Sequence, residues 1–143
     1  MSLKISKDKF FYDNFLKNPN KNLSRIKSLL SKLGNPESTL SNIIHIAGTN
    51  GKGSTLAFLK SCLIENNLSV NAYVSPHLET INERIIIKGS IVDDESLDQI
   101  IRECLIILGK QKISFFEFMT ACAFELFKRN TSDWNLIEVG MGG

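Results

Sequence analysis

The pattern of apolar and polar residues changes its period near residue 40 of this 143-residue chain. Before that point, apolar residues recur at helical spacing over residues 10–16 and 23–33, and proline or glycine follows each stretch, which predicts two amphipathic helices. After it, strands are predicted at 43–47, 70–74, 84–88 and 136–139, and helices at 54–66, 93–108 and 114–129. Strands that alternate with helices predict an α/β fold, with a mostly parallel sheet flanked by helices.

The chain is long enough to form one hydrophobic core. Hydrophobic residues make up 43% of it, and a chain of this size buries roughly 68–70% of the surface of its unfolded form. Internal repeats and linkers are absent from the sequence, so residues 1–143 are predicted to form a single unit. Residues 140–143 follow a predicted strand directly, and a strand exit normally leads into a loop or helix. We therefore expect a truncated, partial domain.

Charge is spread unevenly along the chain. The formal net charge is +2, but residues 1–32 hold eight Lys or Arg and two Asp, a local charge of +6. This segment is either a surface for a polyanion or the solvated face of two helices. Because basic and aromatic residues do not alternate there, the second interpretation is favoured and no nucleic-acid partner is expected.

The cysteines and the apolar segments indicate the cellular setting. Cys62, Cys104 and Cys122 stand singly in apolar helical stretches without C-x-x-C spacing, so they are predicted to be buried free thiols in a reducing compartment. The sequence has neither a signal-peptide pattern nor an apolar run long enough to cross a bilayer. A cytoplasmic protein with no membrane partner is expected.

A glycine-rich turn between a predicted strand and a predicted helix is the strongest chemical signal. It comprises Gly48, Thr49, Asn50, Gly51, Lys52, Gly53, Ser54 and Thr55. Glycines let successive N–H groups converge on one anion, the helix dipole adds positive charge there, and Lys52 adds a full charge. The spacing matches neither the Walker A pattern nor the dinucleotide fingerprint. A phosphate loop is predicted; the alternative is an ordinary turn with an exposed lysine.

Glu138 stands in an otherwise apolar predicted strand. A carboxylate buried in a sheet costs several kcal/mol unless a cation or hydrogen bonds compensate for it. Mg²⁺ at the end of the strand would do so, and Ser75, at the end of another strand, offers a hydroxyl. The alternatives are a glutamate that faces water on an edge strand and an ordinary Ser-Pro strand terminator.

Several other polar residues have structural explanations. His77 is explained equally well as a loop histidine with satisfied hydrogen bonds, and Glu83 and Arg84 as a surface pair. His45 is expected to be a strand residue beside the phosphate loop. Ser114 and Glu117 have capping-box spacing, so Glu117 is a weaker candidate for the site.

Four segments, in order, resemble one known family. They are Gly-Thr-Asn-Gly-Lys-Gly-Ser at 48–54, Ser-Pro-His-Leu at 75–78 with Glu-Arg-Ile at 83–85, Ser-Phe-Phe-Glu at 114–117, and Glu-Val-Gly-Met-Gly-Gly at 138–143. Together they are similar to the folylpolyglutamate/dihydrofolate synthase branch of the Mur ligase superfamily. The resemblance implies that the fold is that superfamily's central phosphate-loop domain and that the C-terminal ligase domain is absent from this chain.

The resemblance also implies an activity. Members join L-glutamate to folate, dihydropteroate or both, with ATP and Mg²⁺, through an acyl phosphate. Carried over by position, residues 48–55 would bind ATP with Lys52 catalytic, Ser75 and Glu138 would bind Mg²⁺, and Pro76, His77, Glu83 and Arg84 would belong to the substrate loop.

This chain alone is expected to bind ATP without catalysing ligation, and the full-length protein is expected to be a monomer. The alternatives are a ligase for peptidoglycan precursors, against which Gly53 and the Ser-Pro-His-Leu segment speak, and a non-catalytic nucleotide-binding module.

Overall fold

The computed structural model describes Phe15, Lys17 and residues 22–141. The helix predicted over residues 10–16 falls outside this part, apart from Phe15. The helices and strands, in chain order, are α2 (Ser24–Lys32), η1 (Pro36–Thr39), β1 (Ile43–Ile46), α3 (Lys52–Glu65), β2 (Val70–Tyr73), η2 (Ile81–Arg84), β3 (Ile85–Ile87), β4 (Ser90–Ile91), α4 (Asp94–Leu108), α5 (Phe115–Arg129) and β5 (Trp134–Glu138). The described elements confirm the α/β class.

The five strands form one sheet in the order β1-β5-β2-β3-β4. Strand β5 runs parallel to β1 on one side and to β2 on the other. Strands β2, β3 and β4 pair antiparallel, so the sheet is mixed and the predicted mostly parallel sheet was wrong in this respect. Between β3 and β4 the chain reverses in a tight turn at Lys88 and Gly89, where both residues have positive φ (48° and 88°). Strand β3 itself reverses direction relative to β2 after the loop of residues 74–84.

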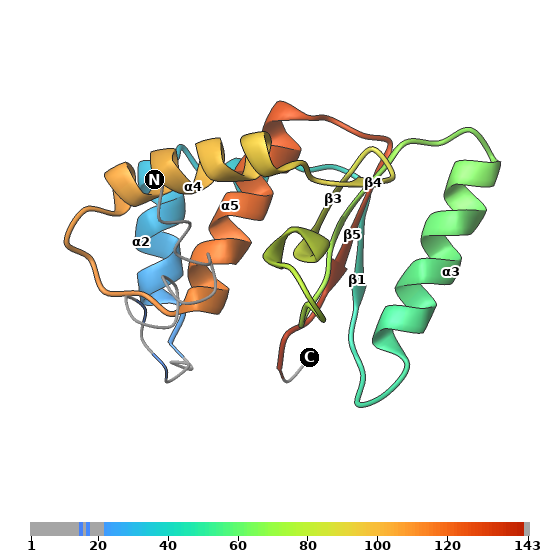
Figure 1. The fold of residues 1–143 in the computed structure, drawn as a ribbon, viewed down its shortest axis with the longest axis horizontal. Helices are drawn as coiled ribbons and strands as arrows, with labels where there is room; N and C mark the ends of the chain where they lie inside the picture. Colours follow the sequence, from blue (N-terminus) through green and yellow to red (C-terminus); the bar gives the residue numbers. More distant parts are fainter. Residues whose placement is uncertain (1–14, 16, 18–21, 142–143) are drawn as a thin grey trace, which may run out of the picture.

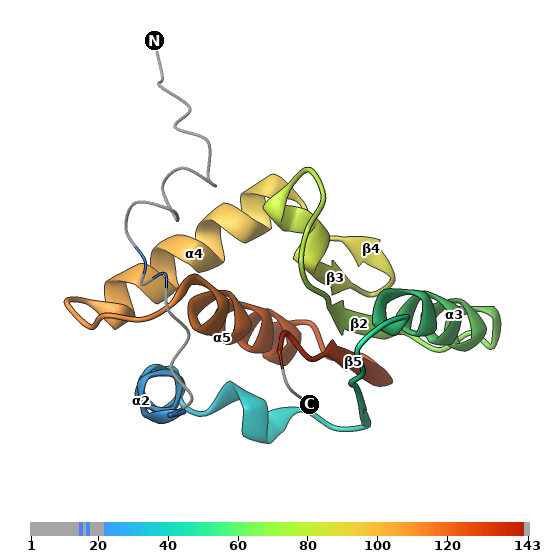
Figure 2. The same cartoon turned by 90° about the horizontal axis from the view of Figure 1, so that it is seen from below.

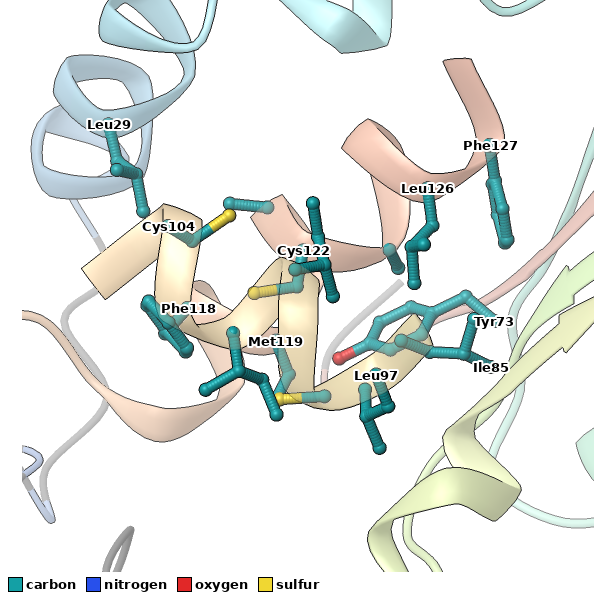
Figure 3. Close-up of a cluster of buried hydrophobic side chains, with 14 of the residues drawn as sticks. Leu29, Tyr73, Ile85, Leu97, Cys104, Phe118, Met119, Cys122, Leu126 and Phe127 are labelled. Atoms are coloured by element: carbon teal, nitrogen blue, oxygen red, sulfur yellow. The ribbon is translucent and has the colours of Figure 1, made fainter. Parts of the chain in front are cut away.

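Helices cover both faces of the sheet (Figures 1 and 2). Of the described helices, α3 lies on one face, and α5 packs on the other with α2 and α4 beside it. Parallel strands require such cover on both faces, because the βα crossovers that connect them place helices there. The larger core lies on the α5 side and includes Leu29, Tyr73, Leu97, Phe118 and Phe127 (Figure 3).

The cysteines divide between the core and the surface. Cys104 and Cys122 are buried in the larger core, as predicted, but Cys62 on α3 is exposed. The prediction for Cys62 was wrong because α3 packs against the sheet along one side, through Leu56, Leu59 and Leu63. Apolar residues on its opposite side therefore face outward. Among the described residues, no helix has the length and apolar character needed to cross a membrane.

Local signals set the ends of several elements. The Asp93 side chain accepts a hydrogen bond from the Ser96 amide (2.8 Å) and begins α4, and the predicted capping box of Ser114 and Glu117 begins α5. Strand β5 begins two residues before its predicted start, because Trp134 and Asn135 pair with the buried start of β2. The polar side chain of Asn135 is satisfied there by donating to the Ser41 carbonyl (2.8 Å).

A matched pair of substitutions tests the assignment of the core. Phe118 is fully buried, whereas Phe58 on the outer side of α3 is 73% exposed. Phe118→Ala is expected to lower the free energy of unfolding by about 3–5 kcal/mol, and Phe58→Ala by less than ~0.5 kcal/mol. Urea unfolding of the two variants measures both values. Equal losses would contradict the described packing.

Candidate functional site

The carboxyl ends of three strands meet at one edge of the sheet. Ile46, the last residue of β1, lies opposite Glu138, the last residue of β5, and Tyr73, the last residue of β2, lies opposite Ile137. The chain leaves β1 and β2 at this edge, and the carboxyl end of β5 lies between them (Figure 1). In parallel sheets of α/β proteins, ligands bind at the carboxyl ends of the strands.

The glycine-rich loop occupies this edge between β1 and α3. Gly48 and Gly51 have φ of 149° and 77°, values that glycine adopts without the strain of a Cβ atom. Helix α3 begins at Lys52, two residues before its predicted start, so Lys52 stands in the first turn of the helix. Its Nζ donates to the Gly48 carbonyl at 2.8 Å, which closes the loop on itself.

The start of α3 is suited to an anion. Gly51 is the N-cap residue of α3, and as a glycine it has no side chain that could cap the helix. The N-cap residue therefore does not compete with a ligand for the first N–H groups of the helix. Thr49, Asn50, Gly53, Ser54 and Thr55 are exposed around it. Exposed N–H groups, the helix dipole and a lysine together favour phosphate.

Glu138 is 6% exposed and ends the strand that lies between β1 and β2. The alternative of a water-facing glutamate on an edge strand is therefore wrong. One of its carboxylate oxygens, Oε2, accepts a hydrogen bond from the Ser75 amide at 3.3 Å. This bond connects the end of β5 to the loop after β2 and brings together the two residues predicted to bind Mg²⁺.

The donor set of this pair fits Mg²⁺. One carboxylate and one hydroxyl suit an ion that usually takes one or two protein ligands and fills its other positions with water and substrate phosphates. In the described ranges, the structure has no cluster of three or more His, Cys, Asp or Glu side chains arranged for a metal. Ser75 and Glu138, beside the phosphate loop, remain the predicted metal ligands.

Glu83 organises the loop that follows Ser75. Its carboxylate accepts hydrogen bonds from the backbone amides of Leu78, Glu79 and Thr80, at 2.7, 2.9 and 2.7 Å. These three bonds favour the ionised form and lower the pKa of Glu83 to about 2. Glu83 therefore shapes the loop by binding its backbone. The Ser75–Pro76 peptide bond at the start of the loop is cis.

Arg84 is 7% exposed, so the alternative of a surface pair with Glu83 is wrong. Its Nε donates to His77 Nδ1 at 2.7 Å, and its guanidinium lies 4.9 Å from the centre of the Phe115 ring. Arg84 thus joins the loop to the first turn of α5. Burial also raises the pKa of the neighbouring Tyr73 hydroxyl to about 12, so the phenol stays neutral.

Sequence reasoning missed one aromatic residue at this edge. Apolar residues of a packed helix are expected to be core, but Phe116 of α5 is 39% exposed and covers Gly140, where a Cβ atom would approach Phe116 Cζ to 2.5 Å. The 3.6-residue period, which turns Phe115 and Phe118 inward, could have placed Phe116 outside. Glu117 instead pairs with Arg25 at 3.0 Å, which supports its structural role.

The hydrogen bonds of Glu83 predict how its removal changes the loop. In Glu83→Gln, a neutral amide oxygen replaces the carboxylate, so the amides of Leu78, Glu79 and Thr80 are expected to exchange their hydrogens faster. Stabilisation by an acid whose pKa is depressed is present above its ordinary pKa of 4.5 and is lost as the pH falls through about 2. The difference in stability between wild type and variant should therefore be largest above the ordinary pKa and shrink below it.

Glu79→Gln is the matched control for this experiment, because it removes the same charge from the same loop and leaves the three bonds intact. Hydrogen exchange followed by NMR, together with unfolding at several pH values, measures both effects. The same exchange rates in the two variants would rule out the proposed role of Glu83.

Comparison with known proteins places this chain in a family. No protein-family model matches the chain. A dihydrofolate synthase/folylpolyglutamate synthase from Bacillus subtilis is 39% identical over 128 residues, which cover 85% of this chain and 30% of that protein. The chain therefore spans about 30% of the length of this curated relative.

Solved structures agree with this similarity. A complex of FPGS with AMPPCP and folate superposes with a TM-score of 0.86 and 32% identity, and covers 94% of this chain and 34% of that one. A bifunctional folylpolyglutamate synthase/dihydrofolate synthase with Mn, AMPPNP and L-glutamate bound gives a TM-score of 0.79 and 33% identity, over 88% and 31% of the two chains. In sequence and in fold, the chain belongs to the folylpolyglutamate/dihydrofolate synthase family of the Mur ligase superfamily.

Proposed function

We propose that this chain is the ATP-binding part of a ligase that joins L-glutamate to folate, to dihydropteroate or to both, with ATP and Mg²⁺. One observation carries the proposal: the phosphate loop, Glu138 and Ser75 lie at the carboxyl ends of neighbouring strands, and the Ser75 amide donates to the Glu138 carboxylate. These residues supply what a transferred phosphoryl group needs, namely N–H donors, a lysine and a metal site.

The chemistry explains why these groups are needed. A carboxylate is a poor electrophile, so it must first be activated before an amine can displace one of its oxygens. Transfer of the γ-phosphoryl group of ATP to the carboxylate gives an acyl phosphate, and the amine of glutamate then displaces phosphate. Mg²⁺, when bound, neutralises charge on the phosphate oxygens.

The residues of this chain would act by position and charge. Lys52 and the first amides of α3 would hold the phosphates of ATP, while Glu138 and Ser75 would hold the metal on the same side of the sheet. Such positioning and charge stabilisation supply most of the catalysis in phosphoryl transfer.

The ligand-bound relatives support the choice of substrates. One of the two structures described above contains AMPPCP and folate, and the other contains Mn, AMPPNP and L-glutamate. Because this chain corresponds to about a third of each, we propose that residues 1–143 form a partial N-terminal domain. Ligation would require the remaining parts of the relatives, and the complete protein would act as a cytoplasmic monomer on these small molecules.

Removal of the Lys52 amine tests the phosphate loop. Lys52→Ala is expected to weaken Mg²⁺-dependent ATP binding at least ~10-fold, since a hydrogen bond to a charged group contributes about 1.5–3 kcal/mol. Calorimetric titration of the folded chain measures this change. Lys110→Ala, which removes an exposed lysine after α4, is the control and should bind as the wild type does. Equal affinities of the two variants would exclude the loop as the nucleotide site.

A second substitution separates the metal from the nucleotide. Glu138→Gln keeps an oxygen for the Ser75 amide but removes the charge that Mg²⁺ needs. We expect wild-type ATP binding to strengthen when Mg²⁺ is added, and the variant to lose most of this gain while its metal-free binding persists. Glu125→Gln is the matched control, because Glu125 is equally buried (7% against 6%) but pairs with Arg129 on α5. An unchanged Mg²⁺ effect in Glu138→Gln would refute the assignment of Glu138.

A further inference from the structure

The hydrogen bond between Arg84 and His77 fixes which imidazole nitrogen carries the proton. Arg84 Nε donates to His77 Nδ1 at 2.7 Å. A guanidinium has donors and no acceptor, so Nδ1 must accept with its lone pair. A neutral imidazole carries one proton, which must then be on Nε2. His77 is thus held in a single tautomer, whose second nitrogen is a donor.

The side chain of Arg84 is held in one orientation by its surroundings. It is 7% exposed, and its guanidinium lies over the Phe115 ring at 4.9 Å from the centroid. A long side chain packed in this way has lost most of its rotamer freedom. The donor of the hydrogen bond to His77 is therefore a buried side chain whose position is fixed by packing.

Arg84 also holds the loop on both sides of Ser75 and Pro76. Its carbonyl accepts a hydrogen bond from the Val74 amide at 2.9 Å, and its side chain binds His77 three residues later. Between these two contacts, the Ser75 amide donates to Glu138 at 3.3 Å. The segment 74–77 is therefore attached at three points, and Arg84 provides two of them.

We propose that Arg84 is a positioning residue that acts through His77. It holds the imidazole as an Nε2–H donor in the loop beside Ser75, a form that suits an anionic oxygen. The acceptor would be a phosphate oxygen of ATP or the carboxylate of the folate substrate. The choice of acceptor rests on the proposed function, whereas the tautomer rests on the Arg84 contact alone.

NMR of the ¹⁵N-labelled chain tests the tautomer directly. Two-bond ¹H–¹⁵N correlation spectra distinguish a protonated from an unprotonated ring nitrogen, at about pH 8, where an ordinary histidine is neutral. The chain has two histidines, and His45→Gln assigns the signals of the other. We expect His77 to show an unprotonated Nδ1 and a protonated Nε2.

Two arginine substitutions separate positioning from general stability. Arg84→Met keeps much of the side-chain length but removes the donor, and it should convert the His77 signals into those of exchanging tautomers. Arg25→Met is the control, because Arg25 pairs with Glu117 on α5 (3.0 Å). It should lower stability and leave the tautomer of His77 unchanged.

Each outcome decides the proposal. A wild-type His77 protonated on Nδ1, or averaged between tautomers, overturns it, as does a folded Arg84→Met variant with an unchanged His77 spectrum. If Arg84→Met does not fold, the wild-type spectrum decides by itself. Addition of Mg²⁺ and ATP in one sample, and of folate in another, shows which ligand shifts the His77 Nε2 signal. If neither does, the substrate contact is wrong and the tautomer assignment stands.

These arms are independent of the test of the proposed function. Loss of ATP binding in Lys52→Ala depends on the phosphate loop and does not involve His77. A chain that binds ATP but shows averaged tautomers would keep the proposed function and overturn the role of Arg84. A chain with the expected tautomer but without ATP binding would keep the role of Arg84 and overturn the proposed function.

Discussion

Parallel pairing of β5 with β1 on one side and β2 on the other is the constraint on which the candidate site depends. Residues 46, 73 and 138 are far apart in the sequence, yet parallel alignment places them at one edge. The same alignment places β5 between two neighbouring strands, so the carboxylate of Glu138 is shielded from water. A buried carboxylate needs a partner. The Ser75 amide, after the adjacent strand, supplies one, and the proposed Mg²⁺ would supply another.

The loop after β2 shows how a surface segment is made rigid by its neighbours. Glu83 binds three backbone amides, and Arg84 binds both Val74 and His77. Arg84 lies against Phe115 at the start of α5, so the loop is connected to the helix that forms the larger core. The candidate site is thereby built on packed elements, which keeps its polar groups in defined positions.

Much of the fold could be predicted from the sequence because its signals are local. The spacing of hydrophobic residues identified α2 to α5 and four of the five strands, and the capping box of Ser114 and Glu117 placed the start of α5. The short β4 and the mixed sheet were missed, since a two-residue strand carries no period and strand direction depends on long-range pairing. Cys62 was misplaced because α3 is apolar on more than one side and the sheet covers only one of them.

The sequence by itself determined the glycine-rich loop with its lysine, the resemblance to the family and the identity of the polar residues, because these depend on residue type and spacing. Only the tertiary structure decided that Glu138 is buried on a central strand, that Arg84 is an interior residue bound to His77, and that Phe116 covers Gly140. Burial and hydrogen-bond partners are properties of packing. They arise when strands distant in the chain come into register, and local sequence does not encode that register.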